Sequence, residues 1–136
     1  MYLSLQGNIG LGKAIEYFTS NQMTVSVPLN DTQKYDLAVE IDGKLSRVQV
    51  KTSRNRTASG AYQILLRHCG VASGKNVCTP FDRSGCDYIF AYTADDKMYL
   101  IPSEKISSSN AINVGEKYKE YEVHSRRFSE FAMSVS

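Results

Sequence analysis

The sequence predicts an α/β (or α+β) domain with a mixed β-sheet of about four or five strands flanked by helices. Two observations lead to this fold class. A segment with helical spacing comes first, and several segments with strand-like alternation follow before short helical pieces end the chain. The 136 residues suffice for one domain, 1–136, and the 42% hydrophobic and 22% charged fractions are ordinary for a globular protein.

Residues 8–20 form the predicted helix. Four apolar residues share one helical face at positions i, i+3, i+4 and i+7: Leu11, Ala14, Ile15 and Phe18. Gly10 and Gly12 weaken the first turns, but they allow another backbone to approach closely. Glu16 lies at the edge of the apolar stripe. It is either a solvated helix residue or an acidic group that reaches a neighbouring strand.

Residues 34–53 predict a β-hairpin. Apolar and polar residues alternate through residues 35–42, as in a strand with one buried face, and Asp42-Gly43 is a two-residue turn signal. Counting outward from this turn pairs Ile41 with Lys44, and the same register places Asp36 opposite Gln49. Lys51 is one step along on the same face. A carboxylate, an amide oxygen and an ammonium are therefore expected on one patch.

The rest of the chain is predicted more coarsely. Strand-like segments cover four further ranges: 23–29, 62–67, 87–92 and 97–101. The last two are expected to pair around a turn at Asp95 and Asp96. Residues 52–60 read as a basic loop, residues 69–85 as an irregular segment, and Ser103 as the cap of a short helical turn. The tail beyond residue 107 gives no strong pattern.

Positive charge is concentrated in one segment. Residues 44–81 hold seven basic and no acidic side chains, whereas the rest of the chain holds nine basic and fourteen acidic ones, although the net charge is only +2. This is the distribution expected of a protein with a polyanionic partner. A solvated basic face without a partner is the alternative.

The three cysteines, an odd number without C-x-x-C spacing, predict free and mostly buried thiols in a reducing compartment. A zinc site from His68, Cys69, Cys78 and Cys86 is possible on paper, but its spacings match no usual zinc motif. No secretion signal or membrane-spanning run is visible, so a cytoplasmic, DNA-associated location is expected.

The patch on the predicted hairpin suits phosphodiester chemistry. The Asp36 carboxylate, the Gln49 amide oxygen and the Val50 backbone carbonyl are hard oxygen ligands of the kind that Mg²⁺ prefers. Lys51 can orient an attacking water or neutralise developing negative charge. An exposed polar hairpin face without catalytic function remains the alternative, because the pattern is short.

The same residues carry a family resemblance. Asp36 and Gln49-Val50-Lys51, after a helix that bears Glu16, resemble the PD-(D/E)XK nuclease superfamily with its restriction-endonuclease-like core. The segments 7–53 and 86–106 are most similar to group I intron-associated homing endonucleases, in which glutamine takes the second acidic slot. The resemblance implies Mg²⁺-dependent cleavage of double-stranded DNA. It implies Asp36 as a metal ligand, Gln49 in the acidic slot and Lys51 as the catalytic lysine, with Glu16 as a further catalytic candidate. Two departures are Tyr35 in place of the usual proline and the neutral Gln49.

A chain with one such site cuts both strands only as a homo-oligomer, a dimer or tetramer. Candidate DNA contacts come from the basic segment and its neighbourhood: Ser53, Arg54, Arg56, Arg67, Lys75 and Arg83. The leading hypothesis is a site-specific homing endonuclease. The alternatives are a structure-specific nuclease such as a Holliday junction resolvase, and a non-catalytic DNA-binding domain on the same fold.

Overall fold

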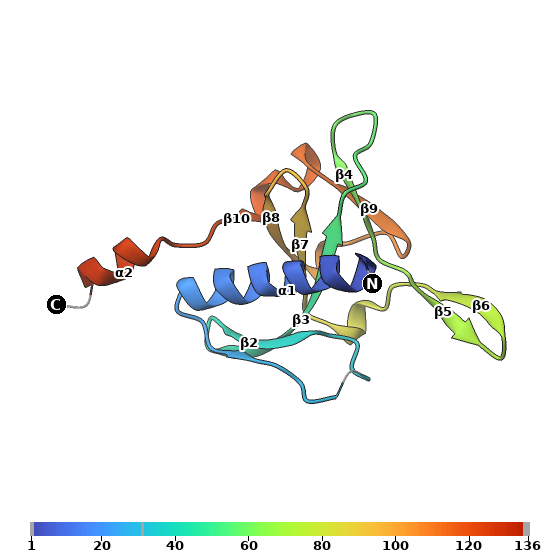
Figure 1. Ribbon diagram of the computed structural model, residues 1–136, viewed down its shortest axis with the longest axis horizontal. Coiled ribbons are helices and arrows are strands. Elements are labelled where there is room, and N and C mark those ends of the chain that lie inside the picture. The colour runs from blue at the N-terminus through green and yellow to red at the C-terminus, as the bar shows by residue number, and fades with distance from the viewer. Residues whose placement is uncertain (1, 31, 135–136) are drawn as a thin grey trace.

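The computed structural model describes residues 2–30 and 32–134, and its centre is a mixed six-stranded sheet in the order β1-β2-β3-β7-β8-β10 (Figure 1). β3 and β7 are parallel, and the other neighbours are antiparallel. The bounds are β1 Val25–Ser26, β2 Leu37–Ile41, β3 Lys44–Ser53, β7 Tyr88–Thr93, β8 Met98–Pro102 and β10 Glu122–Val123. The four longer strands form the centre expected from the sequence, and two-residue strands extend it at both edges.

The two faces of this sheet are covered by different elements. Helix α1 (Tyr2–Ser20) packs Ala14, Tyr17 and Phe18 against one face, where they meet side chains such as Leu37 and Phe90. Over the other face lies a core that includes Ile64, Ile89, Ile101 and Ile112. Ile64 and Ile112 belong to a small sheet of β4 (Tyr62–Leu65) and β9 (Ala111–Val114). The central sheet is thus buried on both sides.

The predicted turn between β2 and β3 is confirmed. Asp42 and Gly43 both have positive φ, 51° and 77°, as a type I′ turn requires. Ile41 pairs with Lys44 and Leu37 pairs with Val48, so the register is the one counted from the sequence. One step further, the Asp36 N–H donates to the Val48 carbonyl at 2.8 Å. Asp36 therefore lies across from Gln49, just beyond the end of β2.

Several boundaries differ from those expected. The first helix begins at Tyr2 instead of residue 8 and includes three glycines, of which only Gly10 lies against the sheet. The strand predicted over 23–29 shrinks to Val25–Ser26 at a sheet edge. The tail adds β9 and β10, the 3-10 turn η3 (Glu116–Tyr121) and helix α2 (Phe128–Ser134). Figure 1 shows α2 extending away from the sheet. The short helical turn is confirmed as η2 (Ser103–Lys105), but Ser103 as its cap is wrong, because Ser103 is the first residue of the turn and Pro102 precedes it as the N-cap.

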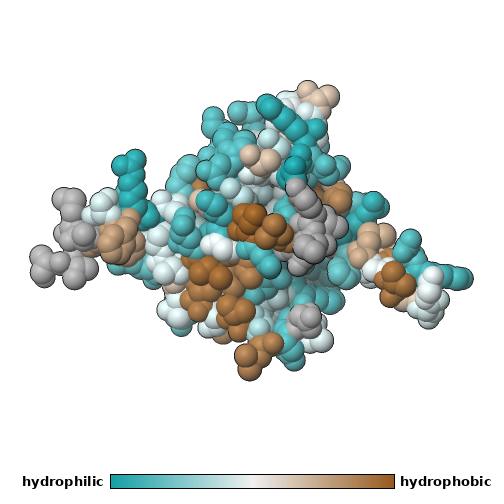
Figure 2. All heavy atoms as spheres, viewed as in Figure 1, coloured by the Kyte–Doolittle hydropathy of each residue, from teal (hydrophilic) through white to brown (hydrophobic). Residues whose placement is uncertain are grey.

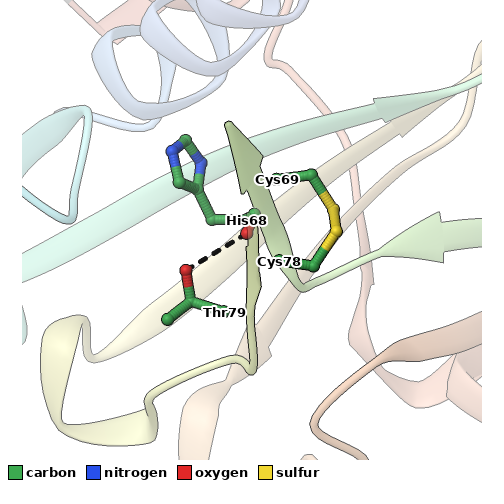
Figure 3. The surroundings of a disulfide bond; sticks show 4 residues. All are labelled: His68, Cys69, Cys78 and Thr79. Atoms are coloured by element: carbon green, nitrogen blue, oxygen red, sulfur yellow. Dashed lines mark hydrogen bonds between the residues drawn. A yellow bond between two sulfur atoms is a disulfide. The ribbon is translucent and has the colours of Figure 1, made fainter. Parts of the chain in front are cut away.

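The prediction of an irregular segment at 69–85 was wrong. β5 (His68–Ala72) and β6 (Lys75–Thr79) form a two-stranded hairpin, followed by the short turn η1 (Arg83–Gly85). The expectation of three free thiols was also wrong, because Cys69 and Cys78 form a disulfide across this hairpin (Figure 3). Only Cys86 is free and buried. The disulfide consumes two of the four possible zinc ligands, and that site is excluded.

No helix within the described part of the chain is long and apolar enough to cross a membrane.

Gly10 lies where α1 touches β3 most closely. A Cβ atom at this position would overlap the Thr52 methyl group and would come within 3.4 Å of Val50 Cγ1. Gln6, one helical turn earlier, donates from Nε2 to Thr52 Oγ1 at 2.9 Å. The glycine and this hydrogen bond together place the helix on the strand that carries Gln49 and Lys51.

We expect Gly10→Ala to lower the free energy of unfolding by about 1–3 kcal/mol, because α1 must move away from β3 to make room for the methyl group. Gly12→Ala is the matched control, since a Cβ added at Gly12 would meet no atom within 4 Å. It should raise the free energy of unfolding by about 1 kcal/mol through helix propensity. Urea titration of both variants measures the difference, and equal stabilities would contradict the close approach.

Candidate functional site

Asp36 is attached to β3 by a hydrogen bond of its own side chain. The Val50 N–H donates to Asp36 Oδ2 at 2.7 Å, and this contact adds to the backbone bond between Asp36 and Val48. The two bonds hold an exposed carboxylate against the middle of a strand instead of leaving it free in a loop. The three residues Gln49, Val50 and Lys51 are therefore grouped with Asp36, as the register predicted.

The Val50 carbonyl has no strand partner on this side. Val48 O and Val50 N both point toward the β2 edge of β3, because both bond to Asp36, and in a strand the N–H and C=O of one residue point the same way. β2 ends before it reaches Val50. Among residues 2–30 and 32–134, no backbone hydrogen bond outside the strand ladders reaches Val50 O. This carbonyl oxygen is thus available beside the Asp36 carboxylate.

Lys51 is a half-buried cation without a salt bridge among the described residues. Burial lowers the pKa of its ammonium from the ordinary value of 10.5, and the nearby Asp36 carboxylate partly offsets this effect. Lys51 pairs with Ala91 on the central strand β7, on the sheet face where the buried Cys86 lies. A lysine held in this way keeps its charge close to the Asp36 carboxylate without forming a salt bridge in the described chain.

Gln49 and Glu16 differ in placement. Gln49 is half-buried, pairs with Ile89 across β3 and β7, and its amide makes no hydrogen bond to any other described residue. Glu16 is exposed on α1, which covers the opposite face of the sheet through Ala14 and Tyr17. Its side chain has no hydrogen bond or ion pair to the cluster in the described chain. The structure brings three of the four predicted catalytic side chains together and leaves Glu16 apart.

A reciprocal clamp aligns β3 with β7 just before Gln49. The Asp87 N–H donates to the Arg47 carbonyl at 2.8 Å, and the Arg47 N–H donates to Asp87 Oδ2 at 2.7 Å. The Arg47 guanidinium adds longer contacts of 3.4 Å. Burial acts to raise the pKa of Asp87, but the hydrogen bonds from Arg47 outweigh it and lower that pKa. The spacing of Arg47 and Asp87 in the sequence gave no signal for this pair.

The segment before Asp36 is held by Lys34. Its Nζ donates to Asp82 Oδ2 at 3.0 Å, and its stem packs on Gly85, where a Cβ would lie 2.9 Å from Lys34 Cδ. Hydrogen bonds from Ser84, and then from Lys34, lower the pKa of Asp82 to about 2. The turn η1 is thereby joined to the start of β2, two residues before Asp36.

The predicted DNA-contacting residues lie in different settings. Arg54, Arg56, Arg67, Lys75 and Arg83 are exposed, whereas Ser53 is only 5% exposed and its hydroxyl donates to the Gln63 carbonyl. Arg54 and Arg56 belong to the loop between β3 and β4, at the top of Figure 1. Lys75 is on the β5–β6 hairpin, which projects from another part of the molecule.

Arg83 in η1 is less available for DNA, because its Nε already donates a hydrogen bond to the Ile106 carbonyl.

Arg54 borders a cavity of about 290 Å³ between the start of α1 and the ends of β3 and β7. Four cations of the basic segment thus lie on two separate projections, Arg54 and Arg56 on the β3–β4 loop and Arg67 and Lys75 at the β5–β6 hairpin.

Oxygen ligands for a hard divalent cation are present, but few of them are charged. Asp36 supplies one carboxylate, Val50 an unpaired carbonyl and Gln49 an uncommitted amide. No group of three or more His, Cys, Asp or Glu side chains suited to a metal occurs within the described residues. Such a donor set fits Mg²⁺, which binds through one or two carboxylates and keeps several waters. It does not fit a structural zinc site, which is closed by four Cys or His ligands.

Comparisons with known proteins agree with this geometry. A solved bacterial homing endonuclease, I-Ssp6803I, superimposes with a TM-score of 0.75 at 24% identity over 97% of this chain and 92% of that one. This likeness shows that the chain has the restriction-endonuclease-like fold predicted from the resemblance. Protein 5.3 of Escherichia phage T7 is 33% identical over 104 residues, which are 75% of this chain and 81% of the phage protein. A family model of PD-(D/E)XK endonucleases matches residues 1–134, and the chain therefore belongs to the PD-(D/E)XK endonuclease family.

Proposed function

We propose that this nuclease-family protein is a Mg²⁺-dependent, site-specific endonuclease of the homing type, which hydrolyses phosphodiester bonds in double-stranded DNA. The observation that carries the proposal is the Asp36 carboxylate, bound to the Val50 N–H at 2.7 Å beside the unpaired Val50 carbonyl and Lys51. Nucleases of this family generally use divalent metal ions. Asp36, Gln49 and Val50 would hold Mg²⁺ here, and the ion would supply an activated water and stabilise charge on the phosphate.

Lys51 has the complementary task. Its ammonium is half-buried and unpaired among the described residues, so it can contact a non-bridging oxygen of the scissile phosphate and neutralise the charge that develops there. β3 and β7 fix the position of its backbone, because Lys51 pairs with Ala91 within a parallel ladder that is buried on both faces. A group held on a central strand loses little entropy when the substrate arrives.

Binding of DNA is assigned to the basic residues of the two projections. Arg54 and Arg56 on the β3–β4 loop, and Arg67 and Lys75 around the β5–β6 hairpin, are exposed and free to contact phosphates or base edges. Arg83 is a weaker candidate because of its bond to Ile106. Ser53 would act by shaping the loop through its bond to Gln63. Glu16 would reach the site only if the first helix moved.

The active species is proposed to be a homodimer or tetramer of one-domain chains, associated with DNA in the cytoplasm. One site per chain cuts one strand, so cleavage of a duplex needs a symmetry-related second site. Exposed apolar side chains on α1 offer an interface: Leu5 is 58% and Ile9 is 50% exposed. Figure 2 shows apolar surface gathered over the middle of the face that α1 crosses. Such a patch is typical of a protein–protein contact.

A junction-resolving nuclease is the second candidate, because the same cluster would serve it. Preferential cleavage of four-way junctions over linear duplex would favour that function. A non-catalytic DNA-binding domain is the third, and it predicts binding without Mg²⁺-dependent cleavage.

The decisive test is the loss of cleavage in Asp36→Asn and Lys51→Ala. Each should lower the rate of plasmid cleavage in Mg²⁺ by about 10²–10⁴-fold, because Asp36→Asn removes the one charged metal ligand and Lys51→Ala removes the cation that contacts the phosphate. Glu40→Gln and Lys44→Ala are matched controls, since they change exposed residues of β2 and β3 outside the cluster. Full cleavage by Asp36→Asn and Lys51→Ala, or no cleavage by the unmodified protein across a plasmid library, would refute the proposal.

Lys51→Met separates function from stability. Burial disfavours the charged form of Lys51, so replacing the ammonium with an apolar chain of similar length should raise the free energy of unfolding by about 0.5–1 kcal/mol. Cleavage should be lost in the same variant. Lys44→Met, at an exposed site, should leave both properties unchanged. A Lys51→Met protein that is less stable than the unmodified one would show that the ammonium has a structural role.

Ile9→Glu tests the interface on α1. A charge at Ile9, an exposed apolar residue one helical turn from Leu5, should convert oligomer to monomer, visible as a lower mass in light scattering. Asn8→Glu places the same charge on an adjacent, already polar site and should leave the mass unchanged. The same mass for both variants would exclude this part of α1 from the interface.

A further inference from the structure

We propose that the β5–β6 hairpin is a duplex-DNA-binding ribbon whose affinity is controlled by the Cys69–Cys78 disulfide: strong when the disulfide is formed and weak when it is reduced. The inference rests on the proposed action on DNA and adds a regulated contact to it. It does not depend on which residues perform the cleavage.

The hairpin is not held in place by packing. All ten residues of its two strands are exposed, including Val71 at 74% and Val77 at 46%. Figure 1 shows it projecting from the body of the molecule. An isolated two-stranded hairpin is marginally stable at best in water, because it buries little apolar surface. Something other than a core must keep these strands in register.

The disulfide meets this need. Cys69 and Cys78 are directly opposed in the antiparallel register, with their Cα atoms 4.0 Å apart (Figure 3). The chain reverses at Ser73-Gly74, whose φ angles of 53° and 74° suit a type I′ turn. The turn and the disulfide thus close both ends of a short ribbon. Below the disulfide, the Thr79 hydroxyl donates to the His68 carbonyl at 3.2 Å.

Shape and charge of the ribbon both suit a DNA groove. Five residues per strand span roughly 17 Å, and the major groove of B-DNA admits a two-stranded β-ribbon. No acidic residue occurs in the hairpin, whereas Lys75 lies beside its tip and Arg67 directly precedes it. The register places Lys75, Val77 and Thr79 on one face and the disulfide on the other. One face can therefore contact DNA while the sulfur atoms stay open to solvent.

The root of the ribbon is joined to the candidate catalytic cluster. β6 ends at Thr79, and three residues later Asp82 binds Lys34 at 3.0 Å. Lys34 is two residues from Asp36. On the other side of the root, the N–H groups of Leu66 and Arg67 both donate to the Asn110 carbonyl. The base of the hairpin is thus fixed close to Asp36, so a duplex bound along the hairpin would lie near the candidate catalytic cluster.

Reduction has a defined chemistry. A dithiol reductant, as its thiolate, attacks one sulfur of the Cys69–Cys78 bond and forms a mixed disulfide, which releases the other cysteine as a thiolate. The second thiol of the reductant then closes a disulfide within the reductant and frees the first cysteine. Two electrons and two protons pass to Cys69 and Cys78, and the reductant leaves oxidised. Both cysteines are exposed, so a reductant can reach them.

The test uses the full chain with a fluorescein-labelled duplex of random sequence in EDTA, where no cleavage occurs. Reduction with dithiothreitol should weaken binding about tenfold, because the ribbon must then be ordered at the expense of binding energy. The double variant Cys69→Ala, Cys78→Ala should bind as weakly as reduced protein, with or without reductant. Lys75→Ala should lower the salt slope of binding by about one, whereas Lys105→Ala, at an exposed site on η2, should not.

Equal affinity of oxidised and reduced protein, within twofold, would overturn the inference. So would a change in oligomer mass on reduction without a change in affinity, which would make the hairpin an assembly arm. Cleavage in Mg²⁺ is scored separately. Redox-independent binding with intact cleavage refutes only the ribbon, whereas redox-dependent binding without cleavage refutes only the nuclease proposal. Urea unfolding of the body should be the same in both redox states, since no hairpin residue belongs to either core cluster of the described chain.

Discussion

The hydrogen bond from the Val50 N–H to Asp36 Oδ2 is the interaction on which the candidate site depends. It forms because the Asp42-Gly43 turn sets the register of β2 and β3, and because the ladder of β2 stops at Leu37, next to Asp36. A shift of one residue would send Asp36 to the other face of the sheet. The same early end of β2 leaves the Val50 carbonyl without a strand partner in the described chain. Because β2 stops pairing before Val50, the Asp36 carboxylate and the Val50 carbonyl both offer oxygen atoms at this point. A continuous β2–β3 ladder would leave neither group available.

Burial of the central strands explains why the cluster is rigid and why it lowers the stability of the folded chain. β3 lies between β2 and β7, with α1 on one face and the β4–β9 layer on the other. Gly10 permits α1 to approach Thr52 closely, and the Arg47–Asp87 clamp aligns β3 with β7. Within this frame, Lys51 is held with a lowered pKa and no counter-ion among the described residues. An unpaired, half-buried cation destabilises the folded chain, which is the pattern expected where function and not stability selects a residue.

Short-range patterns carried most of the correct predictions. The hairpin over 34–53, its register, the second hairpin and the turn at Ser103 all follow from turn chemistry and alternation within about twenty residues. The β5–β6 hairpin could have been predicted in the same way, because Cys69 and Cys78 are equidistant from Ser73-Gly74. Its glycines instead suggested an irregular segment. The exposed polar strands lack the apolar alternation that usually marks a sheet.

The sequence by itself determined the pairing of Asp36 with Gln49 and the nuclease family, because register and motif are local properties of the chain. The tertiary structure decided what lies far apart in sequence. It placed Glu16 on the opposite side of the sheet, turned Ser53 into the interior, and joined Arg47 to Asp87 and Lys34 to Asp82. It also divided the positive charge of residues 44–81 between β3, the β3–β4 loop and the β5–β6 hairpin. These outcomes depend on how α1 and the small sheet pack on β3 and β7, and no local pattern encodes the relative placement of such separate elements.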